Sequence, residues 1–228
     1  MTYNIRHGLT TTNQSNLSRV ADLIKKSKVD LVAIQEIDSA TVRSLGRNQV
    51  RYLAQATGLK AAYGRAVTER QGSHGLAILS RYPIIATQVV QLPTSGEGAR
   101  RVLLCAYVEL PPKGNTLRFC TAKLDPHSVA NRTAQAGTVT ALLKSSIQPV
   151  VWAVDLHSHT DDPLIRQMAR YWRYAGINTE QITFPDLVSR FDYLLTRPNG
   201  ELTQSNYRVL EENRTSDHYP VIATFRLR

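Results

Sequence analysis

About ten short runs of apolar or alternating residues dominate the chain, and several follow one another with only a hairpin-length connection between them. Such runs predict β-strands, whereas few stretches show the spacing of an amphipathic helix. A purely parallel, doubly wound sheet needs a long crossover between successive strands, so the short connections argue against it. The pattern favours an α/β fold in which two packed, mixed and mostly antiparallel sheets carry a few outer helices.

The predicted strands are 2–6, 31–36, 75–80, 84–91, 101–109, 117–123, 150–155, 191–196, 207–210 and 220–226. The predicted helices are 17–24, 50–57, 129–143 and 163–174. At 228 residues and 42% hydrophobic, the chain can bury one substantial core, and no repeat or linker divides it. We therefore expect one domain over 1–228, with a mobile loop at 93–98.

The chain is basic, with 28 Lys and Arg against 18 Asp and Glu and a formal net charge of +10. This balance favours polyanionic partners, although a basic surface that only aids solubility is an equal alternative. No apolar run approaches the roughly 20 residues of a membrane span, so we expect a soluble chain without a transmembrane segment. Because Met1 already lies inside the first strand pattern, secretion after removal of a leader stays open, and the localisation is unknown.

The two cysteines lie in consecutive predicted strands, 101–109 and 117–123. If these strands pair as a hairpin with residue 109 opposite residue 116, antiparallel counting places Cys105 opposite Cys120. Cross-strand Cβ atoms are then roughly 4.5 to 5.5 Å apart, close enough for a disulfide. We nevertheless favour two buried free thiols over a disulfide.

Polar side chains gather at the two ends of the chain and at one strand end between them. Residues 2–8 read TYNIRHG, a carboxylate ends the apolar run at QEID (35–38), and SDHYP (216–220) directly precedes the last strand. Oxygen ligands from Asn, Glu and Asp suit a hard divalent cation, and an imidazole can manage charge beside an attacking water. These residues are candidates for a metal-dependent hydrolytic site.

The motifs along the whole chain together resemble the endonuclease/exonuclease/phosphatase superfamily, the metal-dependent phosphodiesterases related to deoxyribonuclease and sphingomyelinase. The matching segments, in the family's order, are TYNI (2–5), QE (35–36), GLAILS (75–80), TAKLD (121–125), VDLH (154–157), RFDY (190–193) and SDH (216–218). Each motif alone is weak evidence, but seven in order are specific. The resemblance implies a four-layer α/β/β/α sandwich with the site where strand ends of both sheets converge.

The same resemblance implies a metal centre. By position, Asn4 and Glu36 look like ligands of Mg²⁺ or Mn²⁺, and Asp217 looks like a further contributor. A hard ion with several retained waters fits such oxygen ligands.

It also implies the groups that act on the phosphate and the water. His218 resembles the histidine beside the scissile phosphate, and Asp192 resembles the carboxylate that orients its imidazole and raises its basicity. Asp155 occupies the position that aligns the attacking water in line with the leaving oxygen. Metal, base and water together would hydrolyse a phosphate ester in one step.

Two departures fall on positions that the family uses for chemistry. Lys123 stands where the family has the histidine of a Thr-His-Leu motif; it can hold a phosphate as a point charge but transfers protons poorly near neutral pH. Val154 and His157 replace the glycine and asparagine of a Gly-Asp-Xaa-Asn motif, so an imidazole takes the place of a neutral donor. We expect a weakened or re-specialised hydrolase, or a protein that binds ligand without turnover.

Simpler roles remain alternatives for these residues. Asn, Asp and Glu also cap helices and turns, and Asp–His pairs also occur as hydrogen-bonded elements of a core. His157, His159, Asp161 and Asp162 could form a separate zinc site, although a solvated polar loop is the favoured interpretation.

Substrate identity is less constrained than reaction type. Arg101 and Lys123 are the favoured phosphate-binding residues. Other basic residues that could line a phosphate site are Arg6, His7, Arg65, Arg70 and Arg100. The chain shows no insertion of the kind that duplex-cutting enzymes place in the minor groove, which favours a phospholipid headgroup or a sugar phosphate over nucleic acid.

We therefore predict a monomeric Mg²⁺- or Mn²⁺-dependent phosphodiesterase or phosphatase. The alternatives are a nuclease, a catalytically silent phosphate- or nucleic-acid-binding module, and a non-enzymatic partner-binding protein that keeps only the fold.

Overall fold

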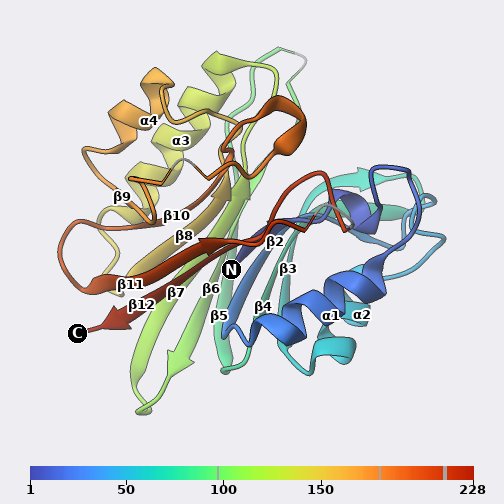
Figure 1. The fold of residues 1–228 in the computed structure, drawn as a ribbon, viewed down its shortest axis with the longest axis horizontal. Helices are drawn as coiled ribbons and strands as arrows, with labels where there is room; N and C mark the ends of the chain where they lie inside the picture. Colours follow the sequence, from blue (N-terminus) through green and yellow to red (C-terminus); the bar gives the residue numbers. More distant parts are fainter. Residues whose placement is uncertain (97, 180, 213–214) are drawn as a thin grey trace.

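Two six-stranded sheets packed face to face form the centre of the computed structural model, which describes residues 1–96, 98–179, 181–212 and 215–228 (Figure 1). The first sheet has the order β11-β12-β1-β2-β4-β3 and the second β5-β6-β7-β8-β10-β9. The strands of the first sheet are β1 (Thr2–Asn4), β2 (Leu31–Ser39), β3 (Lys60–Glu69), β4 (Gly72–Ser80), β11 (Leu202–Val209) and β12 (Val221–Leu227). Those of the second are β5 (Ile84–Gln91), β6 (Val102–Leu110), β7 (Asn115–Lys123), β8 (Val150–Asp155), β9 (Arg173–Tyr174) and β10 (Asp192–Thr196).

Helices cover the outer face of each sheet. Apolar residues of α1 (Leu17–Ser27) and α2 (Gln49–Thr57) pack on the first sheet, and those of α3 (Val129–Leu143) and α4 (Pro163–Met168) pack on the second (Figure 1). Short 3₁₀ turns occur at Arg6–Gly8 and Pro185–Leu187. This arrangement confirms the predicted four-layer α/β/β/α sandwich. Among the described residues, none of the helices has the length and apolar character needed to span a bilayer.

The buried residues divide into three layers because both faces of each sheet are covered. Successive side chains of a strand point to opposite faces, so β7 sends Phe119 into the layer between the sheets and Cys120 into the layer beneath α3 and α4. Continuing this alternation, Thr121 and Lys123 face the first sheet. The strands therefore read as nearly continuous apolar runs, as both-sided burial requires.

Each sheet contains one parallel strand pair, and these pairs determine where polar side chains meet. β1 pairs in parallel with β2, placing Asn4 opposite Gln35, and β7 pairs in parallel with β8, placing Lys123 opposite Asp155. The carboxyl ends of both pairs reach the same edge of the sandwich, where β10 also begins. This edge holds the candidate site.

A bulge near the end of β2 redirects one of these side chains. The pairing with β4 shifts between Ile34 and Ile37, and Glu36 has a φ of 54°. Gln35 points between the sheets, where its amide donates to Thr2 on the neighbouring strand and to Thr121 across the interface. The extra residue of a bulge re-aims a side chain at the end of a ladder, and here it is the Glu36 carboxylate.

Several element boundaries differ from the sequence predictions. Strand β3 was not predicted, because its sequence KAAYGRAVTE is poor in branched apolar residues and it lies at the edge of the sheet. The helix predicted over 163–174 is wrong in its second half: α4 ends at Met168, and the chain then enters β9. Residues 93–96 and 98 carry no helix or strand, as predicted, while residue 97 lies outside the described residues.

The preference for free thiols was wrong. Cys105 and Cys120 are opposite each other on β6 and β7, as antiparallel counting predicts, and they form a disulfide with a Cα–Cα distance of 4.0 Å. Both are fully buried beneath the helices of the second sheet. The register of the β6–β7 hairpin places the two cysteines side by side, and this proximity cannot be predicted from composition alone.

We expect removal of this disulfide to destabilise the domain. Closure of a loop of 15 residues corresponds to about 3 kcal/mol of unfolding free energy, so the double variant Cys105→Ala/Cys120→Ala should lose roughly that amount in denaturant titrations. Mass spectrometry after alkylation in denaturant should show no modified cysteine without reductant and two with it. Full alkylation before reduction would show that the bond is absent.

Candidate functional site

Four polar side chains from both sheets converge at the shared strand edge. The Asn4 amide donates to Glu36 Oε1 at 3.2 Å and to Asp155 Oδ2 at 3.0 Å. The Lys123 ammonium pairs with Glu36 Oε1 and lies 3.2 Å from Asp155 Oδ2. Two carboxylates, one from each sheet, thus share one cation. The period of two along β1, β7 and β8 produces this convergence, since these residues all face the interface between the sheets.

The charges in this cluster support one another. Burial disfavours the ionised form of Glu36, yet Lys123 and His7 outweigh it and hold the pKa of that carboxyl well below its usual range. Burial likewise disfavours a charged Lys123, but Asp155 and Glu36 raise the pKa of its ammonium. The pKa of Asp155 falls to about 2 because Lys123 and His218 overcome its desolvation. All three groups are ionised near neutral pH.

His218 sits beside this cluster and is oriented by a hydrogen bond to Asp192. Its Nδ1 lies 2.8 Å from Asp192 Oδ2, its Nε2 lies 3.4 Å from the Asn4 amide, and its ring packs against Phe184. The Thr183 hydroxyl donates to the same Asp192 oxygen at 2.7 Å. Burial lowers the pKa of His218, but Asp192 outweighs this and raises it to about 9. The imidazole therefore carries a proton at neutral pH.

His157 is placed on the rim of the same site. Its ring stacks on Phe191 at a centroid distance of 4.3 Å, and its backbone N–H donates to Asp155 Oδ1. Burial lowers the pKa of His157 to about 4, with Asp155 opposing the shift. The ring is neutral at physiological pH, and in this respect it resembles the carboxamide that the family pattern has at this position.

Two predicted residues lie at the margin of the cluster. The Asp217 carboxylate forms an ion pair with Arg6, with Nε and Oδ2 3.4 Å apart. Arg101 lines a small pocket together with Glu36, His74 and Lys123, and its Nε lacks a hydrogen-bond partner among the described residues. Arg101 is thus a cation beside Lys123 with part of its donor capacity unused.

The alternative zinc site does not assemble from its four residues. His159 and Asp161 form an exposed pair at 2.8 Å, and Asp162 caps α4 by accepting from the backbone N–H of Leu164. His157 instead packs on Phe191. The groups of described residues close enough to hold a metal ion are His7 with Asp38 and His74, and Asp155 with Asp192 and His218.

A buried carboxylate next to the site had not been assigned a role from the sequence. Asp38 accepts two hydrogen bonds from Arg43, at 2.6 and 2.9 Å, and one from His74 at 2.9 Å. His7 lies between Asp38 and Glu36, with its Nε2 3.1 Å from Glu36 Oε2. Asp38 therefore fixes the histidine that supports Glu36. The sequence signal for Asp38 was only its position two residues after Glu36. No sequence signal pointed to Thr183, which donates to Asp192.

Four of the ten described non-glycine residues with positive φ lie around this site. Arg6, His7, Glu36 and His157 all have positive φ, between 44° and 60°. Such conformations are uncommon for residues with a side chain and persist where surrounding contacts over-determine them. Their occurrence together is typical of a functional site.

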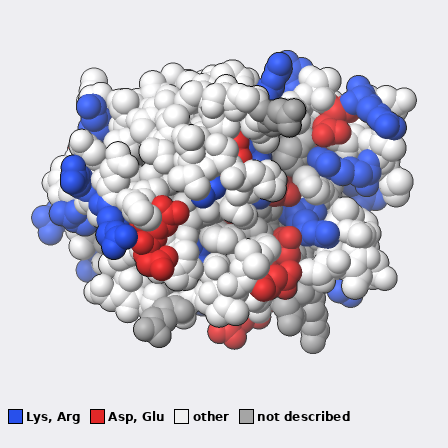
Figure 2. All heavy atoms as spheres, turned by 90° about the horizontal axis from the view of Figure 1, so that it is seen from above, with Lys and Arg blue, Asp and Glu red and all other residues white. Residues whose placement is uncertain are grey.

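The surface around the site carries both signs of charge. Figure 2 shows one face of the molecule, on which Lys and Arg side chains gather toward two sides and acidic side chains lie between them.

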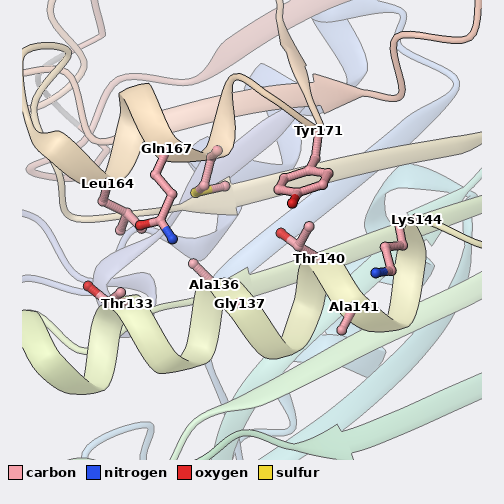
Figure 3. A pocket seen from close by; sticks show the side chains of 10 residues that line it. Thr133, Ala136, Gly137, Thr140, Ala141, Lys144, Leu164, Gln167 and Tyr171 are labelled. Atoms are coloured by element: carbon pink, nitrogen blue, oxygen red, sulfur yellow. The ribbon is translucent and has the colours of Figure 1, made fainter.

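A separate pocket of about 230 Å³ lies between α3 and α4, where side chains including Thr140, Leu164 and Tyr171 face one another (Figure 3). None of the site residues lines this second pocket.

The sequence comparison agrees with this geometry. Residues 1–218 match the Endonuclease/Exonuclease/phosphatase family. The chain belongs to this family. Members of the endonuclease/exonuclease/phosphatase family hydrolyse phosphate esters, and a divalent metal is their usual cofactor.

Individual relatives share 32% sequence identity or less with this chain. Escherichia coli YbhP, an uncharacterized protein, is 32% identical over 120 residues, which are 49% of this chain and 47% of YbhP. The chain thus spans about half the length of the curated relatives it matches. The Bacteroides thetaiotaomicron mannosyl-6-phosphatase has a TM-score of 0.82 at 16% identity, covering 99% of this chain and 98% of that one. D. rerio TDP2 complexed with a single-strand DNA product has a TM-score of 0.79 at 20% identity, covering 99% and 97%. At these identities, the solved structures show the shared fold alone.

The Asp38 network should make a measurable contribution to stability. Burial raises the pKa of Asp38, but hydrogen bonds from Arg43, His7 and His74 outweigh it and bring the pKa well below its ordinary value. Breaking a buried pair on one side costs about 3–5 kcal/mol, so Asp38→Asn should lower the unfolding free energy by that amount at pH 7.

This contribution is complete above the unfolded-state pKa of about 4 and declines as the pH falls below it. The difference between wild type and Asp38→Asn in urea titrations should therefore shrink on moving from pH 7 to pH 3. Asp30→Asn is the control, because the exposed pair of Asp30 with Arg81 contributes about 1 kcal/mol or less. Equal effects of the two variants would contradict the proposed network.

Proposed function

We propose that this protein hydrolyses phosphate esters with a water molecule activated at Asn4, Glu36 and Asp155, with His218 beside the phosphate, using Mg²⁺ or Mn²⁺. The observation that carries the proposal is the convergence of these groups, from two sheets and distant parts of the sequence, at one strand edge.

The donor set fits a hard divalent ion. Glu36 and Asp155 are ionised and already share a cation, the Lys123 ammonium, and Asn4 contributes a carboxamide between them. Carboxylate and amide oxygens are the ligands that Mg²⁺ and Mn²⁺ prefer. Asn4 and Glu36 would hold the ion, and Asp217 would contribute once released from Arg6. The bound ion supplies Lewis acidity toward a phosphoryl oxygen and lowers the pKa of a coordinated water.

His218 and Asp155 have complementary roles. Asp192 keeps His218 protonated near neutral pH, so its Nε2–H can donate to a phosphate oxygen and offset the charge that develops there. Asp155 is ionised and can accept a hydrogen bond from the attacking water, which aligns it with the phosphorus. The sequence-based role of His218 as a base stays a prediction beside this proposed role as a cationic donor in the resting site.

Arg101 and Lys123 would bind the phosphate. Both line the small pocket beside Glu36, and Arg101 has unused donor capacity there. Guanidinium and ammonium groups bind phosphate through charge-assisted hydrogen bonds. His157, neutral and stacked on Phe191, would offer a donor to the same phosphate, as the family's asparagine does.

The substrate class proposed is a phospholipid headgroup or a sugar phosphate, with nucleic acid as the alternative. The mixed charge of the face in Figure 2 supports a small phosphate ester over a polyanion that needs a continuous basic surface. The buried disulfide supports folding in an oxidising compartment, as secreted proteins do.

Substitution of Glu36 tests the site directly. With Mg²⁺ or Mn²⁺, the wild type should hydrolyse bis-p-nitrophenyl phosphate or p-nitrophenyl phosphate, and Glu36→Ala should reduce kcat at least about 10³-fold, since it removes a metal ligand. Glu109→Ala is a matched control, because Glu109 is near the end of β6 that lies away from the site. Activity that survives Glu36→Ala would place the reaction elsewhere.

The two departures from the family pattern make a second test. The double variant Lys123→His/His157→Asn restores a proton-transferring imidazole at position 123 and the carboxamide at position 157. Loss of one such group typically costs about 10² to 10³ in rate, so the double variant should increase kcat by about that factor. Steady-state kinetics on the same esters measures the change. A folded, metal-loaded double variant that is no faster than wild type would show that these positions do not limit turnover.

A further inference from the structure

The Lys123 ammonium occupies the place where the ligand oxygens of the site converge. It pairs with Glu36 Oε1 from the first sheet and lies 3.2 Å from Asp155 Oδ2 on the neighbouring strand. Only 10% of the Lys123 side chain is exposed, and the Asp155 carboxylate is fully buried. The ammonium is therefore paired with two mostly buried carboxylates and is largely shielded from solvent.

A divalent ion and this ammonium compete for the same atom. Glu36 Oε1 accepts from both Lys123 and Asn4, and the other oxygen, Oε2, faces His7. A second cation at Oε1 would be repelled by the ammonium at close range in a poorly solvated site. Metal binding to Glu36 thus requires Lys123 to withdraw from it.

Withdrawal of Lys123 from Glu36 leaves its ammonium with Asp155 as its remaining anion, and the loss of one of two buried ion pairs is unfavourable unless another anion replaces it. The adjacent group in its pocket is Arg101, which is also a cation and whose buried Nε has no partner among the described residues. This pocket has room for about one water molecule, about 10 Å³, so a phosphate would bind at its mouth, where it could neutralise both Arg101 and Lys123. It would give the ammonium an anion in exchange for Glu36.

We propose that Lys123 couples metal loading to phosphate binding: its ammonium blocks Glu36 in the free protein, and a bound phosphate draws it away so that the divalent ion can bind. The proposal rests on the proposed metal-dependent function and adds a control on when the ion enters. By linkage, phosphate tightens metal binding by the same factor as metal tightens phosphate binding. Family members with histidine at this position have no such ammonium.

Binding of Mn²⁺, counted by electron paramagnetic resonance of the free ion, tests this coupling without any turnover. In wild type, inorganic phosphate should lower the Kd for Mn²⁺ about tenfold or more. In Lys123→Met, the Kd without phosphate should already be about tenfold lower than in wild type, and phosphate should change it less than threefold. Samples without protein correct for Mn²⁺ bound by phosphate itself.

Two variants separate the charge of Lys123 from its place in the fold. Lys123→Arg retains a cation and should keep weak Mn²⁺ binding without phosphate, and Lys144→Met removes one exposed surface charge and should behave as wild type. Equal or weaker Mn²⁺ binding by folded Lys123→Met, or an unchanged phosphate effect in it, would overturn the proposal while leaving hydrolysis untouched. Absence of Mn²⁺ binding in every variant would instead overturn the metal-dependent function itself.

Discussion

The ion pair of Lys123 with Glu36 joins the two sheets at the edge where the apolar contact between them ends, and Asp155 on the strand next to Lys123 holds the same ammonium. Deeper in the sandwich, the inner faces meet through side chains such as Ile78, Leu104 and Val151. At the strand ends the same alternation presents charged groups instead. The site is therefore an extension of the sheet interface in which packing gives way to electrostatics.

Buried charges of this kind are stable only as a balanced set. Desolvation disfavours each of Glu36, Asp155 and Lys123 in its ionised form, and the contacts among them compensate. Removal of one member leaves the others uncompensated, which makes the set sensitive to any further cation or anion that enters. A ligand site and a structural ion pair are, in this protein, the same group of atoms.

Much of the fold followed from periodicity. Strands buried on both faces, such as β6 and β8, have continuous apolar sequences, and α3 matches its predicted range of 129–143. The edge strand β3 escaped prediction because small residues suffice where one side lacks a neighbour. The strands that carry Asn4, Asp155 and Asp192 were identified, and their approach at one edge followed from family resemblance rather than from pattern.

Other features depend on geometry that no local pattern encodes. The positive φ of Glu36, the hydroxyl of Thr183 on Asp192 and the packing of Phe191 on His157 arise from loops and a bulge. The departure at Lys123 was visible in the sequence, but its effect was not: a point charge expected to face phosphate pairs with a metal-ligand candidate instead. The anion with which a flexible side chain such as Lys123 pairs depends on the tertiary structure around it.

The covalent tie between β6 and β7 bears on how this selection can change. Cys120 anchors the strand three residues before Lys123, Gln35 bonds to Thr121 across the sheets, and Lys123 is itself in register with Asp155. The backbone beneath the ammonium is thereby immobilised on three sides. The proposed exchange of its partner would then need only rotation about the methylene bonds of one side chain, without a moving loop or domain.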